Sequence, residues 1–172
     1  MGTDKANLLV DGETMSQRIL RQLRQRCEIV TILGREPIEG CAFLEDLELH
    51  AGPLAALSQF TPQAQTVFIA SCDLPRFDGA VVSYFASIID GKDAVIPSVD
   101  GRLQPLCALY SAAAVSRIEA IYASGVRRLQ AWTEQLSVIV VSPEELLANK
   151  VDHYTANGAN SPQELATLLN LN

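Results

Sequence analysis

The sequence lacks an apolar run of the roughly 20 residues that a membrane-spanning helix requires. Its first residues also lack the charged start, long apolar middle and small-residue cleavage site of a secretory signal. Gly2 does not belong to a myristoylation motif, because Ala6 occupies the position where that motif requires serine or threonine. We therefore expect a cytoplasmic protein that makes no contact with a membrane.

Metal-binding side chains are scarce as well. The four cysteines are widely spaced and form no Cys-x-x-Cys pair, and the chain has only two histidines. This composition argues against a zinc site and favours the reduced thiols of a cytoplasmic protein. Ser71 and Cys72 have no histidine near them in the sequence, so nothing indicates nucleophilic catalysis.

Positive charge is also in short supply, since the formal net charge is -7 and the isoelectric point is near 4.8. Such a protein repels the phosphate backbone of nucleic acids, which argues against a nucleic-acid partner. It can still bind a nucleotide when a metal ion supplies the missing positive charge.

The 172 residues fit one domain, 1–172, in which helical and strand-like patterns alternate. The predicted helices cover 13–26, 52–57, 79–89, 112–123, 126–135 and 161–169, and the predicted strands cover 28–33, 66–70, 94–97, 106–110 and 138–141. Ser161 and Glu164 have the spacing of a capping box at the start of the last helix. The alternation indicates a doubly wound α/β fold with a mainly parallel sheet.

Asp73 is the most informative acidic residue. It follows the apolar strand 66–70 within the polar run Ser71-Cys72-Asp73, at the edge of an α/β sheet where ligands bind. A carboxylate in this place suits Mg²⁺, which one or two carboxylates hold together with substrate phosphates. The alternative is an aspartate that caps the next helix or a turn.

Lys5 and Gly52 are candidates for binding phosphate. Lys5 follows a glycine-containing turn and can place an ammonium group on a phosphate, or it is an ordinary surface lysine near a terminus. Gly52 and Pro53 open a predicted helix whose free N–H groups suit an anion, or they form a packing turn.

Further candidates lie in two later segments. Arg102 and Gln104 precede an apolar run, where they can contact a second substrate, although exposure of both at the surface explains them equally well. Asn157 and Asn160 flank Gly158 in a predicted loop that can ligate a metal ion or bind phosphate. Asparagine is also a common loop residue.

Taken in order, several segments resemble molybdenum cofactor guanylyltransferases. The segments are Met1-Gly2-Thr3-Asp4-Lys5-Ala6, Gly52-Pro53-Leu54-Ala55, Cys72-Asp73-Leu74-Pro75, Gly101-Arg102-Leu103-Gln104-Pro105-Leu106, Ala108-Leu109-Tyr110 and Asn160-Ser161-Pro162-Gln163-Glu164-Leu165. The resemblance implies a three-layer, mainly parallel Rossmann-like sheet of the nucleotide-diphospho-sugar transferase type. It also implies transfer of GMP from Mg-GTP to molybdopterin, and contact with molybdoenzyme-maturation proteins.

The resemblance assigns roles to individual residues. It implies that Asp73 is the magnesium ligand and that Lys5 binds phosphate and stabilises charge at the attacked α-phosphate. Asp46 is similar to the family's acidic residue ahead of its Gly-Pro-Leu segment and would contact the nucleotide, and Gly52 would shape that site. Asn160 matches the second asparagine of the family's Asn-x-Asn-Thr-Pro signature, which lies near the metal or phosphate.

The sequence departs from the family in two places. Family members carry a hydrophobic strand and a Leu-Ala-Gly-Gly-x-Ser-x-Arg segment before the Met-Gly-x-x-Asp-Lys run, and this sequence starts at that methionine. We expect the start to be internal to a longer protein, and the 172-residue chain to show weak or no transferase activity. Gly158 stands at the signature's first asparagine. A transferase that uses CTP or another acceptor, and a noncatalytic nucleotide-binding relative, remain alternatives.

Overall fold

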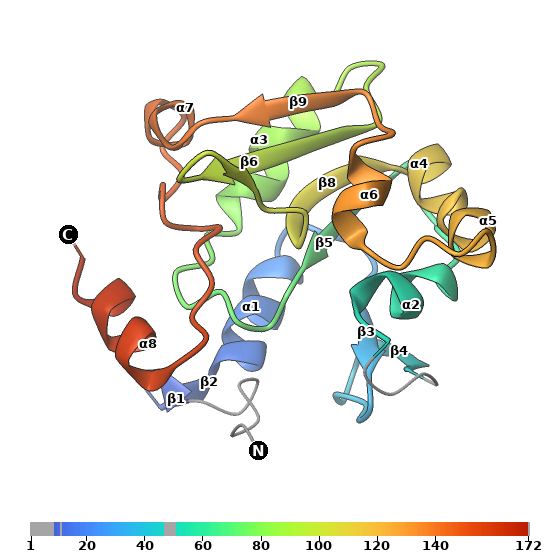
Figure 1. Cartoon of the computed structure of the whole chain (residues 1–172). Helices are drawn as coiled ribbons and strands as arrows, with labels where there is room; N and C mark the ends of the chain where they lie inside the picture. The colour runs from blue at the N-terminus through green and yellow to red at the C-terminus, as the bar shows by residue number, and fades with distance from the viewer. Residues whose placement is uncertain (1–8, 11, 47–50, 172) are drawn as a thin grey trace.

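The computed structural model describes residues 9–10, 12–46 and 51–171 (Figure 1). None of the helices in these ranges is long and apolar enough to cross a membrane. The elements are β1 (Leu9–Val10), β2 (Glu13–Thr14), α1 (Met15–Leu23), β3 (Thr31–Gly34), β4 (Ala42–Glu45), α2 (Pro53–Ser58), β5 (Thr66–Ala70), α3 (Ala80–Ile88), β6 (Ala94–Val99), β7 (Arg102–Leu103), β8 (Cys107–Ser111), α4 (Ala112–Ser116), α5 (Ile118–Ala123), α6 (Leu129–Thr133), β9 (Val138–Val141), α7 (Pro143–Ala148) and α8 (Pro162–Leu169).

A five-stranded sheet forms the centre of the molecule. Its strands follow the order β5-β8-β6, with β9 paired to the other edge of β6 and the short β7 paired to the end of β6. Two smaller sheets join β1 with β2 and β3 with β4. Among the described residues, β5 pairs with β8 along one edge and with no strand along the other.

The expectation of a mainly parallel sheet is wrong for the described strands. β8 runs antiparallel to both β5 and β6, and β7 is antiparallel to β6, whereas β9 and β6 are parallel. The cause is a tight hairpin turn at Asp100 and Gly101, both at positive φ (49° and 73°), between the paired residues Val99 and Arg102. The short connection 100–106 cannot hold the crossover of a dozen or more residues that a parallel neighbour needs.

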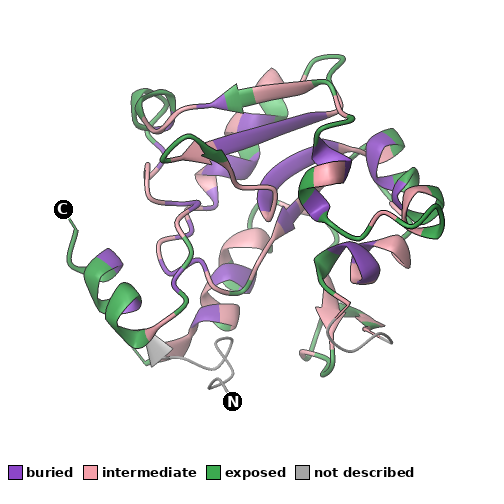
Figure 2. Cartoon of the chain, in the orientation of Figure 1, coloured by how far each residue is buried: buried purple, intermediate pink, exposed green. Residues whose placement is uncertain are grey.

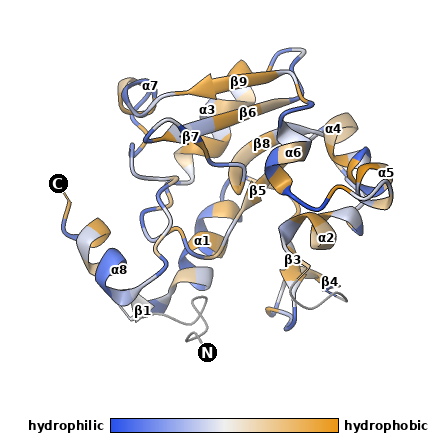
Figure 3. Ribbon diagram, in the orientation of Figure 1, coloured by the Kyte–Doolittle hydropathy of each residue, from blue (hydrophilic) through white to orange (hydrophobic). Residues whose placement is uncertain are grey.

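Helices cover both faces of this sheet, so the three-layer arrangement is present (Figures 1 and 2). Alternate residues of β6 and β8 point to opposite faces, as the pleat of a strand requires. Val95 and Leu109 pack with α1, α3 and α7, whereas Ile96 and Tyr110 pack with α2 and α4–α6, including the buried Trp132. Figure 3 accordingly shows hydrophobic colours along β6, β8 and β9.

A third, smaller cluster joins the two ends of the described chain. Met15 at the start of α1 packs with Ala159, Leu165 and Leu168 of the C-terminal segment. The start of α1 is fixed by a capping box, in which Thr14 and Gln17 satisfy each other's backbone N–H groups. These contacts bring the residues around 159 against α1.

Most predicted elements are present near their expected limits, with β5 and β9 spanning the predicted residues. The structure adds β1, β2, β4, β7 and α7, with β2 taking the first residues of the predicted helix 13–26. It splits the predicted helix 112–123 into α4 and α5 at Arg117. The predicted capping box of α8 is incomplete. Ser161 accepts from the N–H of Glu164, but the Glu164 carboxylate accepts from Asn160 N at 2.6 Å and not from Ser161.

Asp93 makes several polar contacts at the end of the sheet where β6 begins. Its carboxylate accepts from Ser137 N and Ser137 Oγ at 2.9 Å each and pairs with Arg117 at 2.9 Å. Backbone hydrogen bonding from Ser137, aided by Arg117, lowers the pKa of Asp93.

We predict that Asp93→Asn lowers the free energy of unfolding at pH 7 by about 1–2 kcal/mol, because a charged acceptor becomes neutral. The folded-state pKa lies below the unfolded value of about 3.9, so this contribution is present above that value. The difference from wild type should vanish as the pH falls through the lower folded-state pKa. Urea titrations from pH 7 to pH 3 measure this. Asp90→Asn, at an exposed residue, serves as the control, and an equal loss there would contradict the prediction.

Candidate functional site

The carboxyl end of β5 carries the candidate site. β5 ends at Ala70, and the N–H of Ser71 donates to the carbonyl of Leu106 at 2.8 Å, which continues the pairing with the β8 segment for one more residue. The chain then turns away through Leu74 and Pro75, both buried. Asp73 therefore stands at the edge of the sheet, where ligands bind in α/β folds.

Asp73 is half-buried and has one carboxylate oxygen engaged by the chain. Ser71 Oγ donates to Asp73 Oδ1 at 2.5 Å, which fixes the orientation of the carboxylate. The other oxygen, Oδ2, faces Gly158, where an added Cβ would lie 3.6 Å away. The carboxylate is thus partly exposed to solvent and held in one orientation.

The segment 157–160 lies directly beside this carboxylate. The N–H of Ala159 donates to the backbone carbonyl of Asp73 at 2.8 Å, and the Ala159 side chain is buried against Met15 of α1. Asn160 follows at an exposed position, with its backbone N–H held by Glu164. The structure therefore brings Asp73 and the segment of Asn160 together, although they are far apart in the sequence.

The Arg102–Gln104 segment reaches the same edge of the sheet. β5 and β6 run in the same direction, so the turn after β6 lies at the carboxyl end that also carries Asp73. Arg102 is exposed, and Gln104 is half-buried with its side-chain amide donating to the Arg102 carbonyl at 3.1 Å. Gln104 O accepts from Cys107 N. The segment therefore leads directly into the start of β8 beside Ser71.

Asp46 and Gly52 lie on the side of the molecule formed by β3, β4 and α2 (Figure 1). Asp46 is half-buried directly after β4, and its N–H donates to the Gly34 carbonyl at 2.8 Å. Gly52 precedes α2 at a φ of 87°, with no atom within 4 Å of an added Cβ. Lys5 lies outside the described residues.

The oxygen ligands around Asp73 suit a hard cation that takes most of its ligands from water and substrate phosphates. Within the described part of the chain, no group of three His, Cys, Asp or Glu side chains could hold a metal ion. A single carboxylate with an asparagine nearby is compatible with Mg²⁺, which usually takes few protein oxygens and completes its shell with phosphates and water. Asp73 and Asn160 are the residues that would hold it.

Sequence reasoning missed two residues near this site. It considered Ser71 only as a nucleophile, whereas the structure gives its hydroxyl to Asp73. It did not single out Arg76, which borders a cavity of about 450 Å³ lined also by Arg18 and Gln22 of α1, by Asp152 and by Leu169 and Leu171. The nearness of both residues to Asp73 in sequence was the available signal.

Comparison with known proteins identifies the family. The profile described as the MobA-like NTP transferase domain matches residues 1–156 of the chain. The chain belongs to this family. A molybdenum cofactor guanylyltransferase of Desulfosudis oleivorans is 27% identical over 177 residues, covering 95% of this chain and 85% of the relative.

Solved structures agree with the fold expected of the MobA-like NTP transferase family. Molybdopterin-guanine dinucleotide biosynthesis protein A from Archaeoglobus fulgidus superposes with a TM-score of 0.78 at 20% identity, covering 97% of this chain and 89% of that one. The 2-C-methyl-D-erythritol 4-phosphate cytidylyltransferase of Thermus thermophilus reaches a TM-score of 0.70 at 18% identity, covering 95% and 91%. At these identities the likeness establishes the Rossmann-like α/β fold.

Two glycines beside the Asp73 loop provide a matched test of this packing. A Cβ at Gly79 would lie 3.2 Å from Gln22 Cβ and from the Gln22 carbonyl oxygen, whereas a Cβ at Gly158 would make ordinary contacts with Asp73. We predict that Gly79→Ala lowers the free energy of unfolding by about 1–3 kcal/mol through overpacking. Gly158→Ala should change it by less than about 0.5 kcal/mol. Urea denaturation of both variants measures the difference, and a larger loss for Gly158→Ala would contradict the packing.

Proposed function

We propose that the protein is a Mg²⁺-dependent guanylyltransferase that transfers GMP from GTP to the terminal phosphate of molybdopterin and releases pyrophosphate. The observation that carries the proposal is the placement of Asp73. Its carboxylate lies at the carboxyl end of β5, with Oδ2 facing the 157–160 segment, in a chain of the MobA-like NTP transferase family. The names of relatives such as the Desulfosudis oleivorans protein support the choice of substrate.

Each residue of the site has a distinct task in this reaction. Asp73 would hold the magnesium ion through Oδ2, while Ser71 keeps Oδ1 oriented by donating to it. Asn160 would supply a neutral oxygen to the same ion. Bound Mg²⁺ neutralises phosphate charge, and Lys5 would add a further positive charge at the α-phosphate.

Electrostatics explains why this site needs the cation. The chain carries a net charge of -7, so the field of the protein as a whole repels a triphosphate. Phosphoryl-group transfer depends mainly on positioning and on charge neutralisation and needs no covalent nucleophile. A carboxylate that recruits a divalent cation converts local negative charge into a phosphate-binding site. Arg102 and Gln104 would meet the second substrate at the same edge.

A related transferase that uses CTP is the second candidate. The Thermus thermophilus cytidylyltransferase shares the fold at a TM-score of 0.70, so the fold alone does not separate the two nucleotides. Calorimetric titration of the full-length protein with GTP, CTP and ATP, each with Mg²⁺, separates the two. We expect the tightest binding for GTP, and stronger binding of CTP would favour the second candidate.

Asp73→Asn tests the metal role in the full-length protein. The substitution keeps the shape of the side chain and an acceptor for Ser71 but removes the charge that attracts Mg²⁺. We predict that pyrophosphate release from GTP in the presence of molybdopterin falls about 100-fold or more, while the free energy of unfolding changes by less than about 0.5 kcal/mol.

The matched control is Asp100→Asn. Asp100 is an exposed aspartate at the same edge of the sheet, and its positive φ of 49° is tolerated by asparagine. Turnover should stay within about twofold of wild type there. Near-normal activity of Asp73→Asn would remove Asp73 from the metal role.

A further inference from the structure

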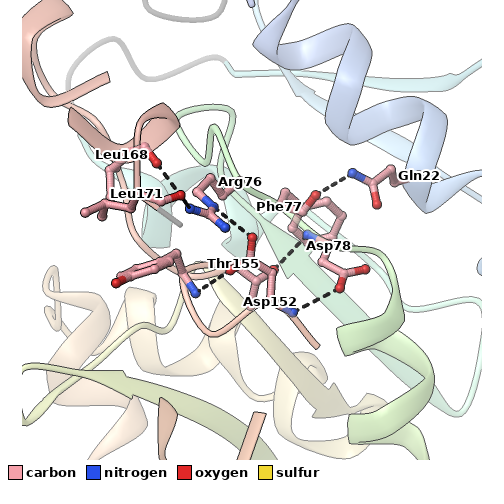
Figure 4. A network of polar contacts seen from close by, with 9 residues as sticks. Gln22, Arg76, Phe77, Asp78, Asp152, Thr155, Leu168 and Leu171 are labelled. Carbon is pink, nitrogen blue, oxygen red and sulfur yellow. Dashed lines mark hydrogen bonds and ion pairs between the residues drawn. The ribbon is translucent and has the colours of Figure 1, made fainter. Parts of the chain in front are cut away.

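Arg76 forms the centre of a set of polar contacts that the proposed reaction does not use (Figure 4). Its Nε donates to Asp152 Oδ2 at 2.8 Å, and its Nη1 donates to the carbonyls of Leu168 at 3.4 Å and Leu171 at 2.5 Å. The guanidinium also lies 4.8 Å from the centroid of the Tyr154 ring. One side chain thus holds both the 152–154 segment and the end of α8.

The residues that follow Arg76 are held from two further directions. Asp78 donates its N–H to Thr155 Oγ1 at 2.8 Å and accepts from Asp152 N at 3.0 Å, so the two segments bind each other reciprocally. On the opposite side, Gln22 of α1 donates to the Phe77 carbonyl and accepts from Gly79 N. The loop 76–79 is therefore clamped between α1 and residues 152–155.

These contacts matter because the segment 150–161 belongs to no helix or strand. No ladder of helix or strand hydrogen bonds sets its path. The segment is held by the burial of Val151 and Ala156 in the core, by isolated backbone turn bonds and by the side-chain contacts of Arg76 and Asp78. The same segment continues to Gly158, beside Asp73 Oδ2, and to Ala159, which binds the Asp73 carbonyl. Arg76 adds a polar contact at one end of this segment to the core packing of Val151 and Ala156, and α8 follows at the other end.

The surroundings of Arg76 argue against an anion site of its own. Arg76 and Arg18 line the cavity of about 450 Å³, but Asp78 and Asp152 line it as well. The local charges therefore balance, and the Nε and Nη1 donors of Arg76 point at oxygen atoms of the chain itself. This arrangement favours a role within the protein over binding of a phosphate.

We propose that Arg76 is a positioning residue for the metal site. By binding Asp152 and the carbonyls at the end of α8, it keeps the 157–160 segment pressed against Asp73, so that Asn160 stays within reach of the ion that Asp73 holds. This inference rests on the proposed function of Asp73. Arginine is required because its planar fork reaches several oxygens at once, which the single ammonium of lysine does not.

Arg76→Lys in the full-length protein tests the proposal by amide hydrogen exchange. We expect the N–H of Ala159 to exchange about tenfold faster or more, because its bond to Asp73 depends on the held segment. Arg117→Lys is the matched control, since Arg117 forms the comparable pair with Asp93 at the opposite end of the sheet. Ala159 should exchange at the wild-type rate in that variant.

The metal response separates positioning from mere stabilisation. In Arg76→Lys, the Mg²⁺ concentration for half-maximal GTP turnover should rise about tenfold, and excess Mg²⁺ should restore the wild-type kcat. Arg117→Lys should leave that concentration unchanged. An accelerated Ala159 exchange with an unaltered Mg²⁺ response would overturn the positioning role.

Asp152→Asn tests the same contact from the other side if Arg76→Lys does not fold. It should reproduce both effects, and the double variant should add nothing beyond either single variant. Wild-type exchange of Ala159 in these variants overturns the inference. If the wild-type protein shows no Mg²⁺-dependent turnover, the proposed function is contradicted instead. The exchange rate of Ala159 then still tests whether Arg76 holds the 157–160 segment, because that rate does not depend on the reaction.

Discussion

The hydrogen bond from Ala159 N to the Asp73 carbonyl, at 2.8 Å, is the contact on which the candidate site depends. It joins the loop after β5 to a segment that lies much later in the chain and has no regular structure of its own. Ala159 is also buried with Met15, Leu165 and Leu168, so the bond is sheltered from water. A backbone contact of this kind fixes the main chain on both sides and leaves the Asp73 side chain available for a ligand.

The direction of β8 explains how the other candidate residues reach the same place. The hairpin turn at Asp100 and Gly101 reverses the chain at the carboxyl end of β6. Arg102 and Gln104 therefore follow at that edge, and Leu106 meets Ser71 next to Asp73. Had the chain crossed over to a parallel neighbour, the next strand would have started at the opposite end of the sheet.

The aspartates at the two ends of the central sheet, Asp93 and Asp73, have different partners. At the end where β6 begins, Arg117 pairs with Asp93 and Ser137 donates hydrogen bonds to the same carboxylate, and these contacts serve stability. At the carboxyl end of β5, the neutral hydroxyl of Ser71 orients the Asp73 carboxylate. For the proposed function this difference matters, because a carboxylate without a counter-charge among the described residues would be able to attract the divalent ion that we propose for it.

The sequence by itself determined the elements whose patterns are local. The apolar run 66–70 predicted β5, and Ser161 predicted the start of α8, because propensity, period and capping act over a few residues. The polar residues up to Asp73 predicted the end of β5. The same local reading overlooked Asp100-Gly101, a pair typical of a hairpin turn, and so took the sheet as mainly parallel.

Only the tertiary structure decided which distant residues meet. It set Gly158 and Ala159 beside Asp73, gave Ser71 a role in orienting the carboxylate, and tied Arg76 to Asp152 and the end of α8. No local signal encodes such contacts, because residues in an irregular segment are placed by the packing of α1 and α8 around them and not by a periodic backbone pattern.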